Sequence, residues 1–206
     1  MTSTEALSHG RLIYVVGPSG AGKDSVIAAA SKIANKNNRL YFSRRYVTRI
    51  AVSDNGDLPV SDNGDLPVSA FAFAHYRQNG FFALDWDAHG FSYGIAATIN
   101  TPLRAGLTVV VNGSRAYLPV ALAKYPAMTV VHVSVPPQVA HARLIARGRE
   151  NAASIAGRMG RTPPLPVPAT QLVNIDNSGA LETAAQALVG VLLGHGKASA
   201  HDGAAV

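Results

Sequence analysis

Short apolar runs alternate with segments of helical character along most of the chain. Continuous apolar runs of this kind, bounded by glycine, proline or polar residues, are typical of strands buried in a parallel sheet. The runs that predict such strands are residues 11–16, 107–111, 129–135 and 172–175. Residues 39–47 instead alternate polar residues with β-branched and aromatic ones, which indicates a further strand or an extended segment.

The residues between these strands predict helices. The predicted helices lie at 22–35, 71–79, 99–105, 117–124, 138–147, 151–159 and 181–193. Residues 82–86 and 92–94 lie on either side of a predicted turn at His89 and Gly90. Because strands and helices alternate, we predict an α/β fold with a doubly wound parallel sheet, in which ligands bind at the carboxyl ends of the strands.

One stretch departs from this alternation. Residues 52–59 read V-S-D-N-G-D-L-P, and residues 60–67 repeat the same letters without change. Asn-Gly followed by Leu-Pro is turn chemistry, and a solenoid would need longer units in more copies. We therefore predict a duplicated surface loop at 52–67 that is mobile and bulges outward.

The most specific motif is at residues 17–25, which read G-P-S-G-A-G-K-D-S between the first predicted strand and the first predicted helix. This pattern and context fit the phosphate-binding loop G-x-x-x-x-G-K-[ST], except at its last position. Its backbone N–H groups and the helix start would surround phosphate oxygens, and Lys23 would reach the β- and γ-phosphates. The alternative is a glycine-rich turn without a ligand. The expected ATP-binding residues are Gly17, Pro18, Ser19, Gly20, Ala21, Gly22, Lys23, Asp24 and Ser25.

Asp24 occupies the position at which most such loops carry Ser or Thr. A hydroxyl oxygen there ligates Mg²⁺, and a carboxylate is also a hard oxygen ligand that Mg²⁺ accepts. We predict that Asp24 ligates Mg²⁺ and that the activity depends tightly on this metal. The alternative is that Asp24 only stabilises the helix start.

Composition indicates a globular protein. The chain has 206 residues, of which 48% are hydrophobic and 15% are charged, which predicts one domain with a full core. The absence of cysteine excludes a disulfide framework and cysteine-ligated zinc. The start of the chain lacks the pattern of a secretion signal, and no apolar run is long enough to span a bilayer. We expect a cytoplasmic protein with no membrane partner.

The formal net charge is +6. A nucleic-acid-binding protein would show a continuous basic stripe with exposed aromatic residues. The arginines instead form two groups in the sequence: Arg44, Arg45 and Arg49, then Arg143, Arg147, Arg149, Arg158 and Arg161. Two groups of cations that flank a phosphate loop suit a small phosphorylated substrate better than a nucleic acid.

Several motifs together carry a resemblance to a known family. They are K-D-S at the end of the phosphate loop, R-Y-V-T-R at 45–49, Y-G at 93–94, V-N-G-S-R-A at 111–116 and R-G-R-E-N at 147–151. The chain resembles the guanylate-kinase-like group of P-loop nucleoside monophosphate kinases. Within that group it is most similar to the family of ribose 1,5-bisphosphate phosphokinases of phosphonate breakdown. The resemblance extends over most of the chain.

This resemblance implies that the γ-phosphoryl group of ATP is transferred to ribose 1,5-bisphosphate, which gives 5-phospho-α-D-ribose 1-diphosphate (PRPP) and ADP. The acceptor is a phosphate oxygen that is already an anion, so positioning and charge neutralisation suffice without a general base. The implied co-substrate and cofactor are ATP and Mg²⁺. The implied catalytic residues are Lys23, Arg147, Arg149 and Arg158, and the implied acceptor-binding residues are Arg45, Arg49, Tyr93, Asp85 and Arg115.

The resemblance also predicts how the chain is divided. A single P-loop kinase domain would cover 10–193, between a disordered leader at 1–9 and a loose tail at 194–206. Within the domain, an acceptor-binding insert at 44–98 and a small lid at 147–162 would close over the substrates.

Alternatives stay open. Asp85 lies where guanylate kinases place an acid that reads guanine, so the conversion of GMP and ATP to GDP and ADP remains an alternative, although Asn112 replaces an acid that is usual in that family. A non-catalytic binding module is a third hypothesis, against which the intact phosphate loop counts. Arg143 is expected on the outward face of a helix, and His89 and His132 are expected to be structural. The sequence does not give the oligomeric state, and a homodimer stays open.

Overall fold

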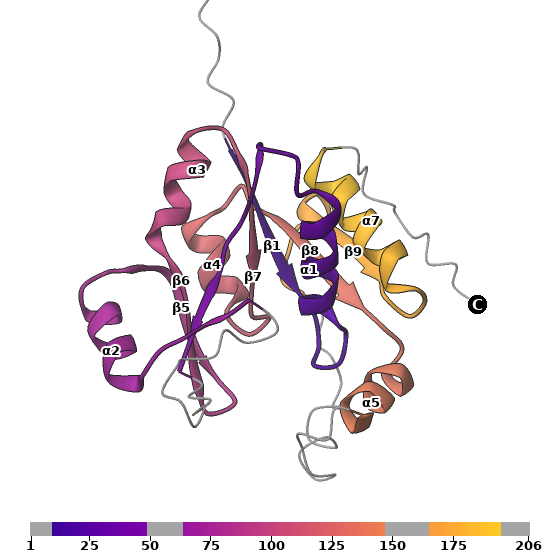
Figure 1. The fold of residues 1–206 in the computed structure, drawn as a ribbon, viewed down its shortest axis with the longest axis horizontal. Coiled ribbons are helices and arrows are strands. Elements are labelled where there is room, and N and C mark those ends of the chain that lie inside the picture. The colour runs from indigo at the N-terminus through magenta and orange to yellow at the C-terminus, as the bar shows by residue number, and fades with distance from the viewer. Residues whose placement is uncertain (1–9, 49–63, 147–164, 195–206) are drawn as a thin grey trace, which may run out of the picture.

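The computed structural model describes residues 10–48, 64–146 and 165–194 (Figure 1). At its centre is a five-stranded sheet with the order β2-β7-β1-β8-β9. Its strands are β1 (Arg11–Val16), β2 (Leu40–Phe42), β7 (Thr108–Asn112), β8 (Thr129–Ser134) and β9 (Leu172–Asp176). All neighbouring strands in this sheet run parallel. The predicted α/β fold with a parallel sheet is confirmed.

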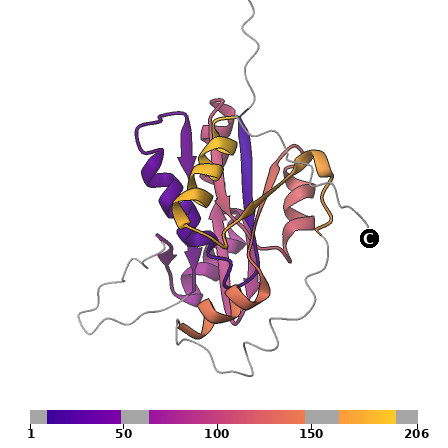
Figure 2. The ribbon, with the colours of Figure 1, turned by 90° about the vertical axis from the view of Figure 1, so that its right-hand side faces the viewer.

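Helices cover both faces of this sheet, as the two views in Figures 1 and 2 show. On one face lie α1 (Lys23–Ile33) and α7 (Leu181–Leu192). On the other face lie η1 (Ala97–Ile99), α3 (Asn100–Arg104) and α4 (Leu118–Lys124). Two apolar cores result, one on each side of the strands. The sheet is therefore doubly wound, as the sequence predicts.

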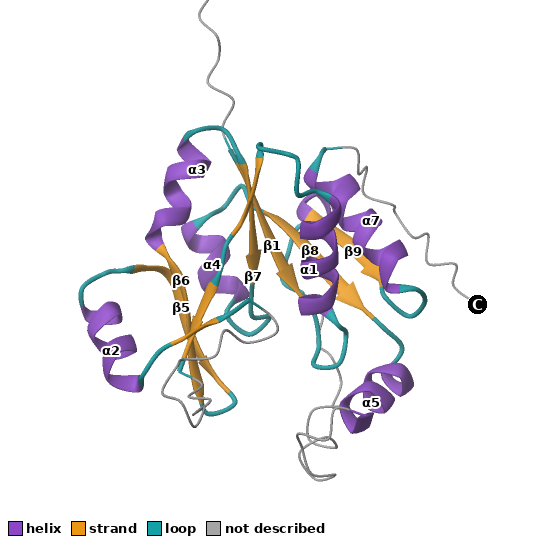
Figure 3. Cartoon of the chain, viewed as in Figure 1, coloured by secondary structure: helices purple, strands orange, loops and turns teal. Residues whose placement is uncertain are grey.

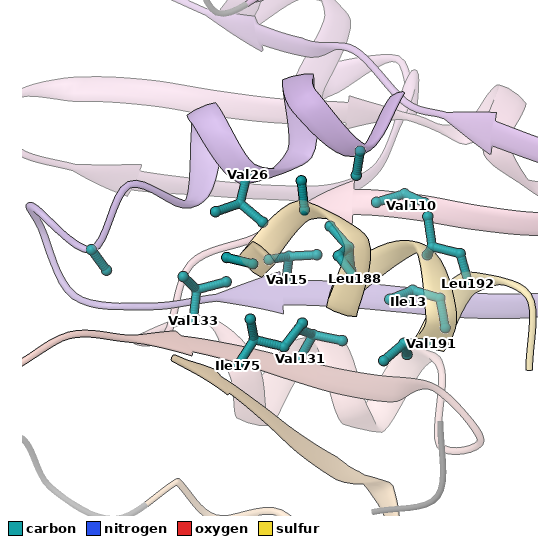
Figure 4. Close-up of a cluster of buried hydrophobic side chains, with 14 residues drawn as sticks. Ile13, Val15, Val26, Val110, Val131, Val133, Ile175, Leu188, Val191 and Leu192 are labelled. Atoms are coloured by element: carbon teal, nitrogen blue, oxygen red, sulfur yellow. The ribbon is translucent and has the colours of Figure 1, made fainter. Parts of the chain in front are cut away.

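The central strand β1 contributes to both cores because its side chains alternate between the two faces. Ile13 and Val15 point into the core beneath α1 and α7 (Figure 4), whereas Tyr14 and Val16 point into the other. All four side chains are completely buried. This burial on both faces explains why the strand reads as an uninterrupted apolar run.

A second sheet, next to the parallel one in Figure 3, has four strands in the order β4-β3-β6-β5. Its strands are β3 (Arg45–Val47), β4 (Leu66–Pro67), β5 (Phe82–Ala88) and β6 (Phe91–Ala96). The helix α2 (Ala70–Gln78) packs on it through an aromatic cluster made by Tyr46, Phe73, Tyr76, Phe81 and Phe82. The single strand predicted over 39–47 is therefore two strands, because β2 belongs to the first sheet and β3 to the second.

The remaining elements that were predicted within the described residues are found close to their expected positions. The turn between β5 and β6 has positive φ angles of 54° at His89 and 79° at Gly90, which suits a two-residue hairpin turn. The helix α5 (Pro137–Ala146) follows β8, and the short η2 (Ala169–Gln171) precedes β9. The predicted leader, the helix at 151–159, the lid and nearly all of the tail lie outside the described residues. In the part of the chain that the structure describes, none of the helices is both long and apolar enough to cross a membrane.

The end of the second repeat forms part of the second sheet. β4 pairs with β3 in parallel, with Leu66 opposite Tyr46, and Asp65 beside it is only 8% exposed. The prediction that the whole duplicated loop bulges outward is wrong for 64–67, because strand pairing and burial of Asp65 hold these residues against the domain. The rest of the repeat lies outside the described residues.

Gly113, directly after β7, offers a test of how tightly the parallel sheet is packed. A Cβ at this position would lie 2.1 Å from the ring of Tyr14, whose hydroxyl bonds both the N–H and the carbonyl oxygen of Ser114. We expect Gly113→Ala to lower the free energy of unfolding by about 1–3 kcal/mol through overpacking. Urea denaturation of the purified variant measures this change.

Gly190 in α7 provides a matched control, because a Cβ there would meet nothing within 4 Å. Gly190→Ala is expected to raise the free energy of unfolding by up to about 1 kcal/mol through helix propensity. Equal effects of the two substitutions would contradict the close contact at Tyr14.

Candidate active site

The phosphate loop joins the carboxyl end of β1 to the start of α1. Gly20 and Gly22 adopt left-handed conformations, with φ angles of 83° and 77°, which residues with a side chain rarely adopt. Gly17 is required for a different reason, because a Cβ there would lie 2.4 Å from the carbonyl oxygen of Val133. The backbone shape of the loop therefore depends on its glycines.

The helix α1 begins at this loop without a side-chain cap, since its N-cap residue is Gly22. The N–H of Val26 bonds the carbonyl oxygen of Gly22 at 3.0 Å, which closes the first helical turn. The N–H groups at a helix start have no partner within the helix, and the helix dipole favours an anion beside them. The loop and the helix start together suit a phosphate group.

Asn177, which follows β9, supports the phosphate loop through a side-chain hydrogen bond. It is 2% exposed, and its Nδ2 donates a hydrogen bond to the carbonyl oxygen of Ala21 at 2.7 Å. Its backbone N–H bonds the carbonyl oxygen of Ser134 at 2.8 Å, at the end of β8. Asn177 thus ties the loop to the edge of the parallel sheet. No sequence motif identifies it, because its partners are backbone atoms far away in the chain.

Arg143 on α5 also approaches the loop. Its Nη1 lies 3.6 Å from the place that a Cβ on Gly22 would occupy. The expectation that Arg143 points outward is therefore wrong. The helix α5, which follows β8, presents this side chain to the phosphate loop. A cation beside the loop is consistent with binding of a polyphosphate.

Asp24, in the first turn of α1, faces the end of β7. Its Oδ1 accepts a hydrogen bond from the Nδ2 of Asn112 and lies 3.9 Å from the Nη2 of Arg45. Asp24 therefore does more than stabilise the start of its helix. It connects the phosphate loop to β7 and to the second sheet.

The surroundings of Asp24 suit a magnesium ion. The Oδ1 of Asn112 is buried, and no described residue bonds it, so an amide oxygen and a carboxylate lie together at the strand ends. Both are oxygen ligands of the kind that Mg²⁺ prefers. The described residues contain no group of three or more His, Cys, Asp or Glu side chains that could hold a metal. A metal here would need phosphate and water as its other ligands, which is usual for Mg²⁺.

Arg45 on β3 is held by a bidentate ion pair. Its Nε and Nη2 donate to the two carboxylate oxygens of Asp65 at 3.0 and 2.8 Å, and 11% of each side chain is exposed. Burial alone would lower the pKa of Arg45, but the hydrogen bonds to Asp65 and the charges of Asp65 and Asp24 outweigh it and raise the pKa. The guanidinium therefore stays charged.

An aromatic stack supports Arg45 from the side of the core. Its Cζ lies 5.1 Å from the centre of the Tyr93 ring, a distance at which a cation is attracted to the ring face. Tyr93 in turn stacks on Trp86 with ring centres 5.7 Å apart and planes 13° apart. The structure thus brings together three of the residues predicted from the sequence, Asp24, Arg45 and Tyr93.

Asp85 is not part of this cluster. It precedes Trp86 in β5, and successive side chains of a strand point to opposite faces. Its Oδ2 lies 2.7 Å from the Nε of Arg77 on α2. The structure therefore separates Asp85 from Arg45 and Tyr93, because the second sheet lies between them and the carboxylate is engaged by Arg77.

Arg115 follows the end of β7 and lies near His132 of β8. Its Nη1 is buried, and no described residue bonds it. Its charge acts on His132 of β8, whose Nδ1 lies 3.2 Å from the Oδ1 of Asn174. Arg115 is therefore at the carboxyl ends of the parallel strands, as predicted. Its role in acceptor binding stays a prediction.

Four further predicted site residues lie outside the described residues. They are Arg49, Arg147, Arg149 and Arg158.

Comparison with known proteins places this site in a family, although no protein-family model matches the chain. Ribose 1,5-bisphosphate phosphokinase PhnN of Burkholderia pseudomallei is 47% identical over 189 residues, which are 91% of this chain and 98% of that protein. The protein of the same name from Desulfomicrobium baculatum is 41% identical over 183 residues, 89% of this chain and 94% of its own. The chain belongs to the ribose 1,5-bisphosphate phosphokinase family. The resemblance predicted from the sequence motifs is confirmed.

A solved structure has a similar fold. Guanylate kinase from Anaplasma phagocytophilum superposes with a TM-score of 0.62 and 15% sequence identity, over 91% of this chain and 86% of that one. At this identity the likeness concerns the fold alone. It confirms the predicted guanylate-kinase-like fold.

His132 gives a prediction for pH. Burial lowers the pKa of His132, its hydrogen bond to Asn174 acts in the opposite direction, and the charge of Arg115 lowers the pKa further. As the pH falls, the unfolded state therefore takes up a proton before the folded state does, at a pKa of about 6.5. The contribution of neutral His132 to stability is complete above that pH and is lost as the pH falls toward the lowered folded pKa.

We expect His132→Gln to make the free energy of unfolding less dependent on pH between about pH 7 and about pH 5, because a neutral amide cannot take up the proton. Urea denaturation at several pH values measures the slope. His75→Gln on α2 serves as the control, since that imidazole is exposed. An unchanged slope in His132→Gln would contradict the expected effect.

Proposed function

We propose that this family member transfers the γ-phosphoryl group of ATP to the 1-phosphate of ribose 1,5-bisphosphate and releases PRPP and ADP. The observation that carries the proposal is the approach of the phosphate loop to the second sheet. Asp24 of the phosphate loop lies 3.9 Å from Arg45 of the second sheet, so a donor phosphate and an acceptor phosphate would meet there. The names of relatives that are up to 47% identical support ribose 1,5-bisphosphate as the acceptor.

The phosphate loop would bind the donor. The backbone N–H groups of the loop and of the start of α1 surround the β- and γ-phosphates, and Lys23 neutralises their charge. Arg143 adds a second cation beside Gly22. Asp24 and Asn112 would hold Mg²⁺, which when bound screens the negative charge of the phosphates.

The second sheet would bind the acceptor as a small subdomain. Arg45 neutralises one acceptor phosphate, and Tyr93 donates its hydroxyl to a phosphate oxygen. Arg49, Arg147, Arg149 and Arg158 are proposed as further cations that surround the transferred group, and Arg115 as a further acceptor ligand. The separate position of Asp85 and its ion pair with Arg77 count against the guanylate kinase alternative, in which this carboxylate would read guanine.

Bond making and breaking in this reaction involve phosphate oxygens only. An oxygen of the acceptor 1-phosphate forms a bond to the γ-phosphorus while the bond from that phosphorus to the bridging oxygen of ADP breaks. Because the attacking oxygen carries a negative charge already, no side chain has to remove a proton. Fixed cations and N–H groups in the correct places therefore account for catalysis.

An assay of ADP release tests the proposed activity on ribose 1,5-bisphosphate and on GMP in parallel, with ATP and Mg²⁺. We expect turnover of the ribose compound. Lys23→Ala should lower kcat/KM by about 10²–10³-fold, as the loss of one group that stabilises transition-state charge usually does. Lys32→Ala, at the exposed end of the same helix, should leave the rate unchanged.

Turnover of GMP alone would overturn the proposed substrate. Absence of turnover with either compound, together with intact ATP binding, would instead point to an effect of the duplicated loop or to a non-catalytic role.

The duplicated loop allows a second test. Deletion of 52–59 leaves one copy of the repeat and keeps residues 64–67, which pair with β3 and contact Arg44 and Arg45. Doubling a loop changes its closure free energy by only about 0.6 kcal/mol. We therefore expect kcat/KM of the shortened chain within about threefold of the full chain. A much larger loss in the same assay would show that the first copy contributes to the site.

A further inference from the structure

The end of the second repeat is fixed in the site on both sides of Asp65. Before it, the carbonyl oxygen of Gly64 accepts a hydrogen bond from the Nε of Arg44 at 3.0 Å. After it, β4 pairs with β3, which carries Arg45. A segment held at both ends gives the carboxylate of Asp65 a defined place, although the sequence around it is turn chemistry.

Asp65 determines which N–H groups of Arg45 are left for a ligand. A guanidinium has five N–H donors, and Asp65 takes the edge formed by Nε and Nη2. Tyr93 covers one face of the guanidinium. The donors that remain are on Nη1 and on the part of Nη2 that faces Asp24. An arginine held by one edge and one face has lost most of its rotamer freedom before a ligand arrives.

We propose that Asp65 is a positioning residue for the acceptor phosphate. It acts through Arg45, whose remaining N–H groups it holds toward the phosphate loop, and it does not touch the substrate itself. The proposal rests on the acceptor-binding role of Arg45 proposed above. An arginine that is oriented in advance loses less entropy on binding than a flexible one, so the pair strengthens binding even though Asp65 carries the same sign of charge as the ligand.

The measurement is the Kd of ribose 1,5-bisphosphate by calorimetry, in the absence of ATP and metal. We expect Asp65→Asn to raise this Kd by about tenfold, the effect of one side chain that must be immobilised on binding. The Kd of ATP should be unchanged, and in the coupled assay the KM of the acceptor should rise while kcat changes little. Asp65→Glu should restore part of the affinity because it keeps the charge.

Two controls test whether the effect is specific to Asp65 and whether it depends on Arg45. Asp57→Asn makes the same change at the equivalent position of the first repeat and should leave the Kd unchanged. In an Arg45→Ala background, Asp65→Asn should have no further effect on the Kd, since the proposed effect of Asp65 on the ligand passes through Arg45. Asp65→Glu keeps the charge beside Arg45, so it carries the test if Asp65→Asn alone does not fold, and a smaller rise in the Kd is then expected.

The outcomes can be told apart. Unchanged or tighter acceptor binding in Asp65→Asn, an equal effect of Asp57→Asn, or a further loss in the Arg45→Ala background would each overturn the positioning role. If the unaltered protein binds and turns over GMP rather than the ribose compound, the proposed substrate fails. The same series with GMP then still tests Asp65, because GMP also presents a phosphate.

Discussion

Arg45 lies largely buried beside carboxylates from two distant parts of the chain, and this ion cluster joins the phosphate loop to the second sheet. A buried charge is tolerated only when ion pairs and hydrogen bonds replace the water that it has lost. Asp65 supplies a bidentate pair, and Asp24 adds a second negative charge at 3.9 Å. These charges connect the start of α1 to the second sheet, and in the function proposed here they are also the charges that a phosphorylated ligand would meet.

The phosphate loop depends on a different kind of support. Its glycines permit the left-handed turns and the close approach to Val133, but they do not select one loop conformation. Asn177 makes that selection by bonding the carbonyl oxygen of Ala21 from a buried position. Because Asn177 is also bonded to the end of β8, the loop is held to the parallel sheet. A rigid loop is what a reaction based on positioning requires.

The second copy of the duplicated segment makes contacts that its local sequence does not predict. Asp57 and Asp65 have the same neighbours over a whole repeat, and no local property separates them. Asp65 is adjacent to a strand that pairs with β3 and lies against a buried arginine. The ion pair between Asp65 and Arg45 therefore depends on the pairing of β4 with β3 and not on the local sequence around Asp65.

Patterns in the sequence were enough to predict the parallel sheet, the succession of most of its strands and helices along the chain, the phosphate loop and the family. Each of these follows from a periodic pattern or from a motif whose residues are close together in the chain. The sequence did not predict that β2 and β3 belong to different sheets, or that Asp85 pairs with Arg77 and lies away from Arg45. It also did not predict that Arg143 lies beside the phosphate loop or that Asn177 supports this loop. Hydrophobic periodicity tells which face of an element is buried, but not which element lies opposite. The partners of polar side chains are set by packing between segments that are far apart in the sequence.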